Sequence, residues 1–410
     1  MLFSQTIVRK PANRTHLGLC LGMLLFMDWG FFAHKLINRM AVFTLPPELV
    51  QIYKPHIDYL TDHAVDADKR RYATTHEAVR HYIDLDHFGA DSLPQQWTSA
   101  LQQFCDLSLV NQDDTLIIDG DQVSRAIELD QELLQLTTSS GEKYNLEVQR
   151  YARFFADSIM PHYYDDSWSI ACAEVWRILN VSQSDCWNVD VADSLSSHGI
   201  LPYHLAHQQR ILTQAFIDRD VERIIRLSAD MGHYLGDAHV PLHTTKNYNG
   251  QLTNQLGIHA FWESRIPELF AEEDYDFFVG KADYISDPRA FFWEVVLESH
   301  ALVDDVLGIE KSLSEIFPDD QQYCFSDRNN LTIRTQCPAY AKAYQERMDG
   351  MVEQRMRQSV QRIGSVWYTA WVDAGQPDIS ELDIAWDKDK KDQELNGLFN
   401  AGKIKGRNHE

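Results

Sequence analysis

The segment HLAHQQRILTQAFIDRDVERIIRLSADMGHYLGDAH, residues 204–239, is the most informative about the fold. Its apolar residues recur every three or four positions, which indicates two amphipathic helices separated by a break near residues 218–220. Residues 339–375 show the same spacing until Gly375 and Pro377 end the helix. No convincing series of alternating strands separated by turns accompanies these helices. The sequence therefore predicts an all-α fold, built as a single multi-helix domain.

The predicted domain covers residues 29–376. Within it, residues 91–166 are less periodic and are interpreted as an insertion with short helices over the core. Residues 377–410 are charged and poor in large apolar side chains, which is typical of a partly disordered tail.

Residues 1–28 have the features of a leader. Basic residues precede an apolar run at residues 17–27, which is too short to span a bilayer but fits the apolar region of a secretory signal. We expect an exported protein that is periplasmic, secreted or anchored to the membrane through this leader. Cleavage before Trp29 would create a new N-terminus, although the small residues typical of a cleavage site are missing. A lipid anchor at Cys20 is the alternative.

The composition limits the classes of function. The chain has 410 residues, 44% of them hydrophobic, with a formal net charge of −24 and an isoelectric point near 5.0. A protein that holds nucleic acid through a basic surface needs the opposite charge balance. A small anionic substrate bound locally by metal ions is compatible with this composition.

The cysteine pattern does not favour a thiolate metal site. None of the six cysteines forms a CxxC pair. Cys324 and Cys337 are close enough in sequence to form a disulfide in an oxidising compartment, or they are two buried thiols.

The segment GHYLGDAHVPLH, residues 232–243, concentrates titratable side chains in an otherwise apolar context. His233 and Asp237 are four residues apart, so on a helix they lie about 40° apart around the axis and can reach one point. Pro241 ends the helix, and His243 follows it. His259 and Glu263 are again four residues apart in an apolar helix. Because a buried carboxylate is costly without a partner, the two pairs together indicate a shared cation.

Zinc is the metal that fits these side chains best. Imidazole and carboxylate groups without a thiolate are the ligands of hydrolytic zinc sites. Several further candidates lie upstream: His34, Asp66, Asp68, His81, Asp84, Asp86 and His87.

The segment HEAVRH, residues 76–81, is not itself a metalloprotease motif. It is similar to the helical HExxH pattern, in which the two histidines are four residues apart. Here His76 and His81 are five residues apart, about 140° around a helix, so they cannot bind one ion together.

Five motifs in order carry a resemblance to a known superfamily. They are WGxxxH at residues 29–34, ADxxR at 67–71, HxxD at 81–84, HxxxD followed by His at 233–243, and HxxxE at 259–263. The chain resembles the zinc-dependent bacterial phospholipases C and the single-strand-specific zinc nucleases of fungi and plants. The resemblance covers residues 29 to about 375. It implies an all-α fold with an inserted segment, and three zinc ions in a cleft.

The resemblance also implies a ligand set for each ion. One zinc would be held by Asp68, His81, His233 and Asp237. The second would be held by His243, His259 and Glu263. The third would be held by His34, Asp237 and the α-amino and carbonyl groups of Trp29, so two ions are expected if Trp29 is not the mature N-terminus. Asp68 is preferred to Asp66 because Arg71 follows it by three residues, as in the nuclease branch.

Such a cluster is suited to a phosphate ester. Three zinc ions outweigh three carboxylates, so the pocket would be positive within an acidic protein, and metal-bound water ionises near neutral pH. We expect hydrolysis of a phosphodiester, with Asp68 orienting or deprotonating the nucleophile and Arg71 stabilising charge on the phosphate. The alternative for Arg71 is a salt bridge with Asp66 or Asp84.

Different sequence features are similar to the two branches, which act on different substrates. Glu263 and the segment before His259 are similar to the phospholipases, whereas WGFFAH and HYID are similar to the nucleases. In the nuclease branch, Tyr82 and Asp84 would bind a base, although an aromatic residue such as Tyr82 is more often part of a core. A phospholipase C-like enzyme is favoured, with a nuclease or 3′-nucleotidase as the alternative.

The two branches imply different partners. A phospholipid substrate would bring contact with a membrane surface, a nuclease would bind single-stranded nucleic acid, and no obligate protein partner is evident. A noncatalytic zinc-binding relative is a further alternative, with metal ions that only stabilise the fold. A phosphohydrolase with adjacent His and Asp ligands is disfavoured, because that dipeptide does not occur in the chain.

Overall fold

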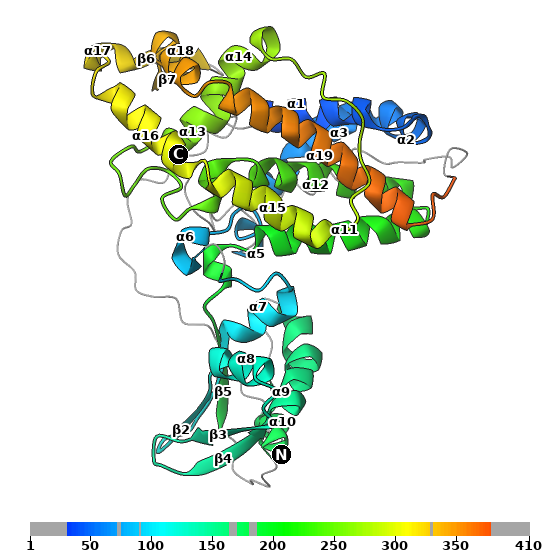
Figure 1. Cartoon of the computed structure of the whole chain (residues 1–410), viewed down its shortest axis with the longest axis vertical. Helices are drawn as coiled ribbons and strands as arrows, with labels where there is room; N and C mark the ends of the chain where they lie inside the picture. Colours follow the sequence, from blue (N-terminus) through cyan, green and yellow to red (C-terminus); the bar gives the residue numbers. More distant parts are fainter. Residues whose placement is uncertain are drawn as a thin grey trace. The chain divides into compact units, whose positions relative to one another are not determined.

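The computed structural model describes residues 31–71, 75–89, 92–163, 170–179, 187–328 and 331–378, and these residues form two compact units (Figure 1). The helical unit takes its described residues from the ranges 23–92 and 198–410. The inserted unit is Leu93–Ser197. The predicted insertion at residues 91–166 lies mostly within this second unit, which continues to Ser197.

Helices form almost all of the helical unit. Its α-helices are α1 Phe31–Ala41, α2 Pro47–Tyr53, α3 Ile57–Asp62, α4 Asp66–Arg71, α5 Thr75–Ala78, α6 Leu85–Phe88, α11 Leu201–Ile217, α12 Val221–Ala238, α13 Ile258–Ala260, α14 Ile266–Asp274, α15 Pro288–His300, α16 Val303–Ser314, α17 Asp319–Gln322, α18 Pro338–Arg347 and α19 Met351–Asp373. Short 3₁₀ turns are η1 Val42–Thr44, η2 Lys54–His56, η3 His63–Val65 and η7 Pro241–Thr244, and a π-turn is η8 Phe261–Arg265.

The break predicted near residues 218–220 separates α11 from α12. The side chain of Asp220 accepts a hydrogen bond of 3.0 Å from the backbone N–H of Arg223, which caps the start of α12. Hydrogen bonds link these helices to α19 within the core, as from Gln209 to the carbonyl of Val366. The indole of Trp367 stacks on Tyr53 at 5.0 Å and donates to the carbonyl of Ser228. This packing fixes α12, the helix that carries two of the candidate ligands.

The inserted unit combines helices with two small antiparallel sheets. Its helices and turns are α7 Trp97–Gln103, α8 Gly120–Glu128, α9 Val148–Phe154, η4 Phe155–Ile159, η5 Met160–His162, α10 Cys172–Ile178 and η6 Ser196–His198, the last residue of which belongs to the helical unit. Its strands are β1 Cys105–Val110, β2 Thr115–Ile118, β3 Leu133–Thr137, β4 Lys143–Glu147 and β5 Asn188–Asp193.

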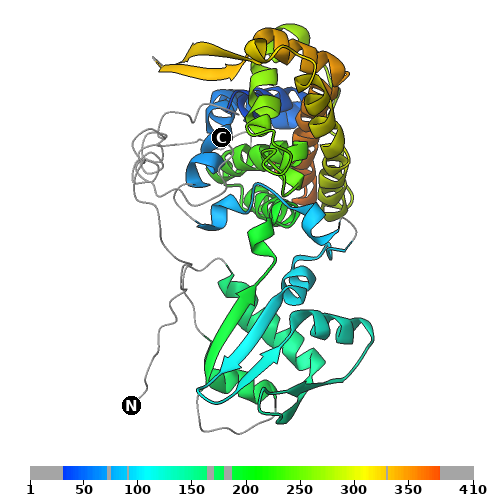
Figure 2. The ribbon, with the colours of Figure 1, turned by 90° about the vertical axis from the view of Figure 1, so that its left-hand side faces the viewer.

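Strand pairing gives the inserted unit its own core. The strand order is β2-β1-β5, with Leu107 opposite Ile118 on one side and Val191 on the other, and β3 pairs with β4 (Figure 2). Alternate residues of β1, beginning with Cys105, are buried. The fully buried rings of Tyr151 and Phe155 complete this core.

The predicted all-α fold class is wrong. The described residues contain seven strands in three antiparallel sheets, so the chain is a mixed α and β protein in which helices predominate. The strands have four to six residues each, and β3 and β4 are largely exposed, so their apolar alternation is weak. Strong helical periodicity elsewhere in the sequence hid them.

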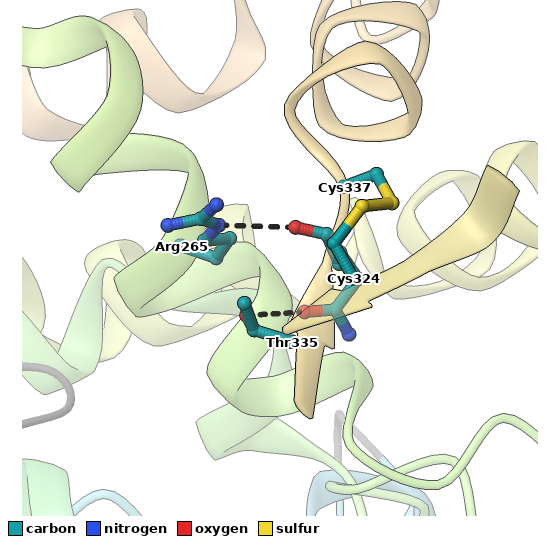
Figure 3. The surroundings of a disulfide bond; sticks show 5 residues. Arg265, Cys324, Thr335 and Cys337 are labelled. Atoms are coloured by element: carbon teal, nitrogen blue, oxygen red, sulfur yellow. Dashed lines mark hydrogen bonds between the residues drawn. A yellow bond between two sulfur atoms is a disulfide. The ribbon is translucent and has the colours of Figure 1, made fainter. Parts of the chain in front are cut away.

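A disulfide anchors the third sheet, a hairpin in the helical unit. Strands β6 Tyr323–Arg328 and β7 Leu331–Gln336 project from the helices (Figure 2). Cys324 and Cys337 are bonded at the base of this hairpin (Figure 3). Arg265 donates a hydrogen bond of 3.2 Å to the carbonyl of Gln336. Of the two alternatives for these cysteines, the structure has the disulfide.

Two terminal predictions lie outside the described residues. The leader at residues 1–28 is one, and the tail is described only to residue 378. No helix in the described ranges is both long and apolar enough to cross a bilayer.

Candidate metal centre

Eight of the predicted ligands come together in the interior of the helical unit. They lie on α1, on α4, after α5, on α12, on η7, on α13 and on η8. They form three groups, within each of which one ligand atom per residue lies within 4.8 Å of the others. The groups are His34, His233 and Asp237; Asp68, His81 and His233; and His243, His259 and Glu263. Each group could hold a metal ion.

Asp237 is at the centre of this arrangement. The His81 Nδ1 atom lies 2.9 Å from Asp237 Oδ2, and His233 Nε2 lies 3.3 Å from the same oxygen. On the other carboxylate oxygen, His34 Nε2 lies at 3.3 Å and His243 Nε2 at 3.7 Å. Asp237 is 1% exposed. Its two oxygens therefore face different groups, as a bridging ligand requires.

Of the two candidate aspartates, Asp68 belongs to the group with His81 and His233, and Asp66 does not. Asp68 Oδ1 lies 3.8 Å from His233 Nε2 and 3.9 Å from His81 Nδ1. Asp66 instead binds His63 at 2.6 Å and Lys69 at 2.9 Å. The guanidinium of Arg71 lies 3.5 Å from Asp68, one turn along α4. Arg71 therefore stands beside this group.

Two ligands of the third group, His259 and Glu263, lie on consecutive turns of one helical segment, and His243 joins them from η7. His259 Nε2 lies 2.7 Å from Glu263 Oε2, and His243 Nε2 lies 3.5 Å from the same oxygen. Glu263 is on the π-turn η8, which interrupts the helix between α13 and α14. Its other oxygen lies 3.1 Å from His34 Nε2. π-Turns are frequent at functional sites, and here one carries a carboxylate between two groups.

Backbone carbonyls fix the orientation of two imidazoles. His233 Nδ1 lies 2.8 Å from the carbonyl of Ala64, and His259 Nδ1 lies 3.1 Å from the carbonyl of Tyr248. A ring that donates its Nδ1–H to a carbonyl presents the lone pair of Nε2, which is the arrangement of histidines that bind metals. Both Nε2 atoms point into the groups.

Two glycines of α12 allow α1 to approach closely. A Cβ atom at Gly236 would lie 2.9 Å from His34 Nδ1 and 2.8 Å from Ile37. A Cβ atom at Gly232 would lie even closer to the side chain of Asn38. His34 accordingly stacks on His233, with ring centroids 4.2 Å apart. The spacing of these two glycines, four residues apart in GHYLGD, is the sequence signal for this close approach.

The carboxylates are anionic in this pocket. Burial acts most strongly on the pKa of Asp237 and raises it, but the imidazoles of His233 and His243 outweigh burial and hold the pKa well below its ordinary value. The pKa of Glu263 is also lowered well below its ordinary value against burial, by hydrogen bonds from His243 and His259.

One imidazole supplies positive charge to these carboxylates. Burial lowers the pKa of His34, but hydrogen bonds to Asp237 and Glu263 outweigh burial and raise the pKa to about 10. A proton on His34 thus supplies part of the positive charge that a metal cation would bring to these carboxylates.

The residues predicted to bind substrate, Tyr82 and Asp84, do not belong to any of the three ligand groups. Tyr82 is 5% exposed and packs against the backbone at Gly199. Asp84 is 1% exposed, and its carboxylate lies 3.1 Å from His198 Nδ1. This pair does not present an open aromatic face for stacking. Trp29, the remaining predicted ligand, lies outside the described residues.

No protein-family model matches the sequence, and neither a curated protein nor a solved structure matches it.

Proposed function

We propose that this protein is a zinc-dependent phosphodiester hydrolase of the phospholipase C-like type. The observation that supports the proposal best is the convergence of eight imidazole and carboxylate ligands, from distant parts of the chain, into three adjoining groups. The five ordered sequence motifs supply these ligands, and they are the basis for proposing membership of the zinc phospholipase C and zinc nuclease superfamily.

The donor chemistry favours zinc over harder cations. Imidazole nitrogen outnumbers carboxylate oxygen in the groups, whereas calcium and magnesium prefer oxygen ligands alone. We expect three ions, or two if Trp29 is not the mature N-terminus. Bound zinc would supply Lewis acidity and ionise a water at neutral pH.

The protein side chains have separate parts in the proposed reaction. The oxygen of a water molecule forms a bond to phosphorus, the bond from phosphorus to the ester oxygen breaks, and the leaving oxygen takes a proton. We propose that Asp68, whose side chain is 19% exposed at the edge of the centre, orients the water and accepts its proton. Arg71, beside Asp68, would offset negative charge that builds up on the phosphate.

Two alternatives have distinct structural requirements. A single-strand-specific nuclease needs an accessible base-binding pair, and burial of Tyr82 and Asp84 is the reason for placing this activity second. A noncatalytic zinc protein needs its ions fully enclosed by side chains. The partial exposure of Asp68 and Arg71 favours an enzyme over that alternative.

Hydrolysis assays test the proposal and choose the substrate. The protein is stripped with a chelator, reloaded with Zn²⁺, and assayed on bis(p-nitrophenyl) phosphate, phosphatidylcholine vesicles and single-stranded DNA. We expect zinc-dependent hydrolysis of the chromogenic diester and of phosphatidylcholine. Hydrolysis of DNA alone would support the nuclease, and bound zinc without hydrolysis of any substrate would support the noncatalytic relative.

Export is a separate proposal. It depends on the leader at residues 1–28. N-terminal sequencing of the secreted protein tests it, and the expected result is a chain that begins at Trp29.

A further inference from the structure

Glu77 is a buried carboxylate directly behind the metal centre, within the segment HEAVRH. It is 2% exposed and lies on the short helix α5, four residues before His81. The hydroxyl of Tyr234 donates to Glu77 Oε1, and Arg80 donates to Oε2 at 2.6 Å. Arg70 lies 3.5 Å from Oε1. The carboxylate is therefore held in one orientation from several sides.

His81 faces the centre with one nitrogen and Glu77 with the other. Its Nδ1 atom lies 2.9 Å from Asp237 and 3.1 Å from His233 Nε2, so Nδ1 is the atom available to a metal ion. Its Nε2 atom is buried and has no hydrogen-bond partner among the described residues. The Glu77 Oε1 atom lies 3.9 Å from Nε2, just beyond hydrogen-bonding distance.

Metal binding through Nδ1 would fix the proton on Nε2. A neutral imidazole carries one proton, and when one nitrogen gives its lone pair to a metal the other nitrogen becomes a donor. A buried N–H without an acceptor is destabilising. A carboxylate that accepts this hydrogen bond orients the ring and strengthens it as a ligand.

We propose that Glu77 is the positioning residue for the metal ligand His81, accepting a hydrogen bond from its Nε2 atom when Nδ1 binds the ion. This inference rests on the proposed function, because it requires a metal ion in the group of Asp68, His81 and His233. A movement of about 1 Å would bring the two atoms from 3.9 Å to an ordinary hydrogen-bond distance of about 2.9 Å.

The surrounding residues couple Glu77 to the ligand helix. Tyr234 follows His233 on α12, and its ring makes an edge contact with His81 at 5.3 Å between centroids. Its hydroxyl donates a hydrogen bond to Glu77 Oε1, which is also the carboxylate oxygen that faces His81. A change at Glu77 is therefore expected to act on His81 and leave the group of His243, His259 and Glu263 unaffected.

The chain offers a matched control in Asp230. This carboxylate belongs to the same polar network, bonded to Arg70 at 3.0 Å. Asp230→Asn removes the same charge as Glu77→Gln from the same arginine. The ion pairs and hydrogen bonds of Asp230 do not include His81. A general electrostatic or stability effect would therefore appear in both variants.

Zinc affinity of the two variants tests the inference. The chelator-stripped proteins are titrated with Zn²⁺ against a chromophoric chelator, and Co²⁺ absorption reports the coordination geometry. In Glu77→Gln we expect one equivalent to bind about 10–100-fold more weakly, with an altered Co²⁺ spectrum, and Asp230→Asn to remain within about twofold of wild type. Equal affinities in the two variants would overturn the inference.

Two further measurements keep the outcomes separate. If Glu77→Gln does not fold in the presence of chelator, Glu77→Asp keeps the charge but withdraws it by one methylene, and we expect a smaller loss in the same direction. An unchanged zinc affinity in Glu77→Asp would overturn the inference. If wild type binds and uses zinc while the variants match it, only this inference fails. Absence of zinc binding in wild type would overturn the proposed function as well.

Discussion

Two polar centres of the helical unit compensate the charge of their carboxylates in different ways. In the arginine centre, Arg355 is 4% exposed and donates to Glu298 at 3.1 Å, to Ser299 at 2.6 Å and to the carbonyl of His239 at 3.1 Å. Arg362 donates to both oxygens of Glu298. In the metal centre, the groups that surround Asp237 and Glu263 are imidazoles.

The two centres differ in how their charge is balanced. A guanidinium is always charged and has several fixed donors, so the carboxylate of Glu298 in the arginine centre is paired by protein groups alone. An imidazole is neutral unless it gains a proton, so the carboxylates of the metal centre depend on a proton at His34 or on another cation. One hollow is lined by residues of both centres, including His34, Glu263, His239 and Arg355. The first centre is structural, and we infer that the second is functional.

Replacing Asp237 is expected to have the largest effect and to separate the two centres most clearly. In Asp237→Asn, two groups lose the charge that bridges them. Loss of an outer ligand partner alone costs about 10–100-fold, so we expect hydrolysis of bis(p-nitrophenyl) phosphate to fall by more than about 100-fold. Metal analysis should show less bound zinc.

Glu298→Gln is the matched control for Asp237→Asn, because it neutralises a carboxylate of the arginine centre. It should keep the zinc content and most of the activity. Equal loss of zinc in both variants would contradict a role in zinc binding that is specific to Asp237.

Replacing Arg355 is expected to lower the stability of the fold and to leave zinc binding intact. Arg355→Met leaves the buried carbonyl of His239 without this donor, while Glu298 keeps its two hydrogen bonds from Arg362, and an unsatisfied buried acceptor costs about 1–3 kcal/mol. Chemical denaturation of the zinc-loaded protein should show this loss in the free energy of unfolding. The zinc stoichiometry should be unchanged, and a lower stoichiometry in folded Arg355→Met would contradict the separation of the centres.

A pair of glycine substitutions tests the close approach of α1 to α12. Gly236→Ala would push against His34 and Ile37, which we expect to cost about 1–3 kcal/mol and to weaken zinc binding. Gly308 on α16 has no atom within 4 Å of the added Cβ, so Gly308→Ala should stabilise the helix by about 0.5–1 kcal/mol. Thermal unfolding with and without zinc measures both. Normal zinc affinity in Gly236→Ala would show that His34 tolerates displacement.

The smallest expected effect is a pH dependence of stability in the arginine centre. Burial raises the pKa of Glu298, but hydrogen bonds from Arg362 and Arg355 outweigh burial and lower the pKa below its ordinary value of 4.5. A lowered pKa in the folded state means that the stabilisation is complete above pH 4.5 and is lost as the pH falls through the folded-state value. Glu298→Gln should therefore flatten the acid side of the stability profile. An identical acid side in the variant would contradict this role.

The local part of the metal centre could be predicted from the sequence. His233 and Asp237, like His259 and Glu263, are four residues apart, and helical geometry alone places each pair on one face. His34, Asp68 and His81 contribute from other segments, so only the resemblance to a family grouped them with these pairs. The structure brings all of them together.

Other features depend on tertiary contacts that no local pattern encodes. Glu77 lies in a segment whose histidines could not share an ion, and its relation to His81 became clear only from the distance between them. In the inserted unit, β1 pairs with β5 across a long stretch of sequence. The strands are only four to six residues long, so they gave no signal comparable to the helical periodicity.

Diffraction from crystals of the zinc-loaded protein, recorded above and below the zinc absorption edge, tests the central claim most directly. We expect anomalous peaks within the group of Asp68, His81 and His233 and within the group of His243, His259 and Glu263. Absence of a peak at both groups, in crystals grown with zinc, would contradict the assignment of this centre to metal ions.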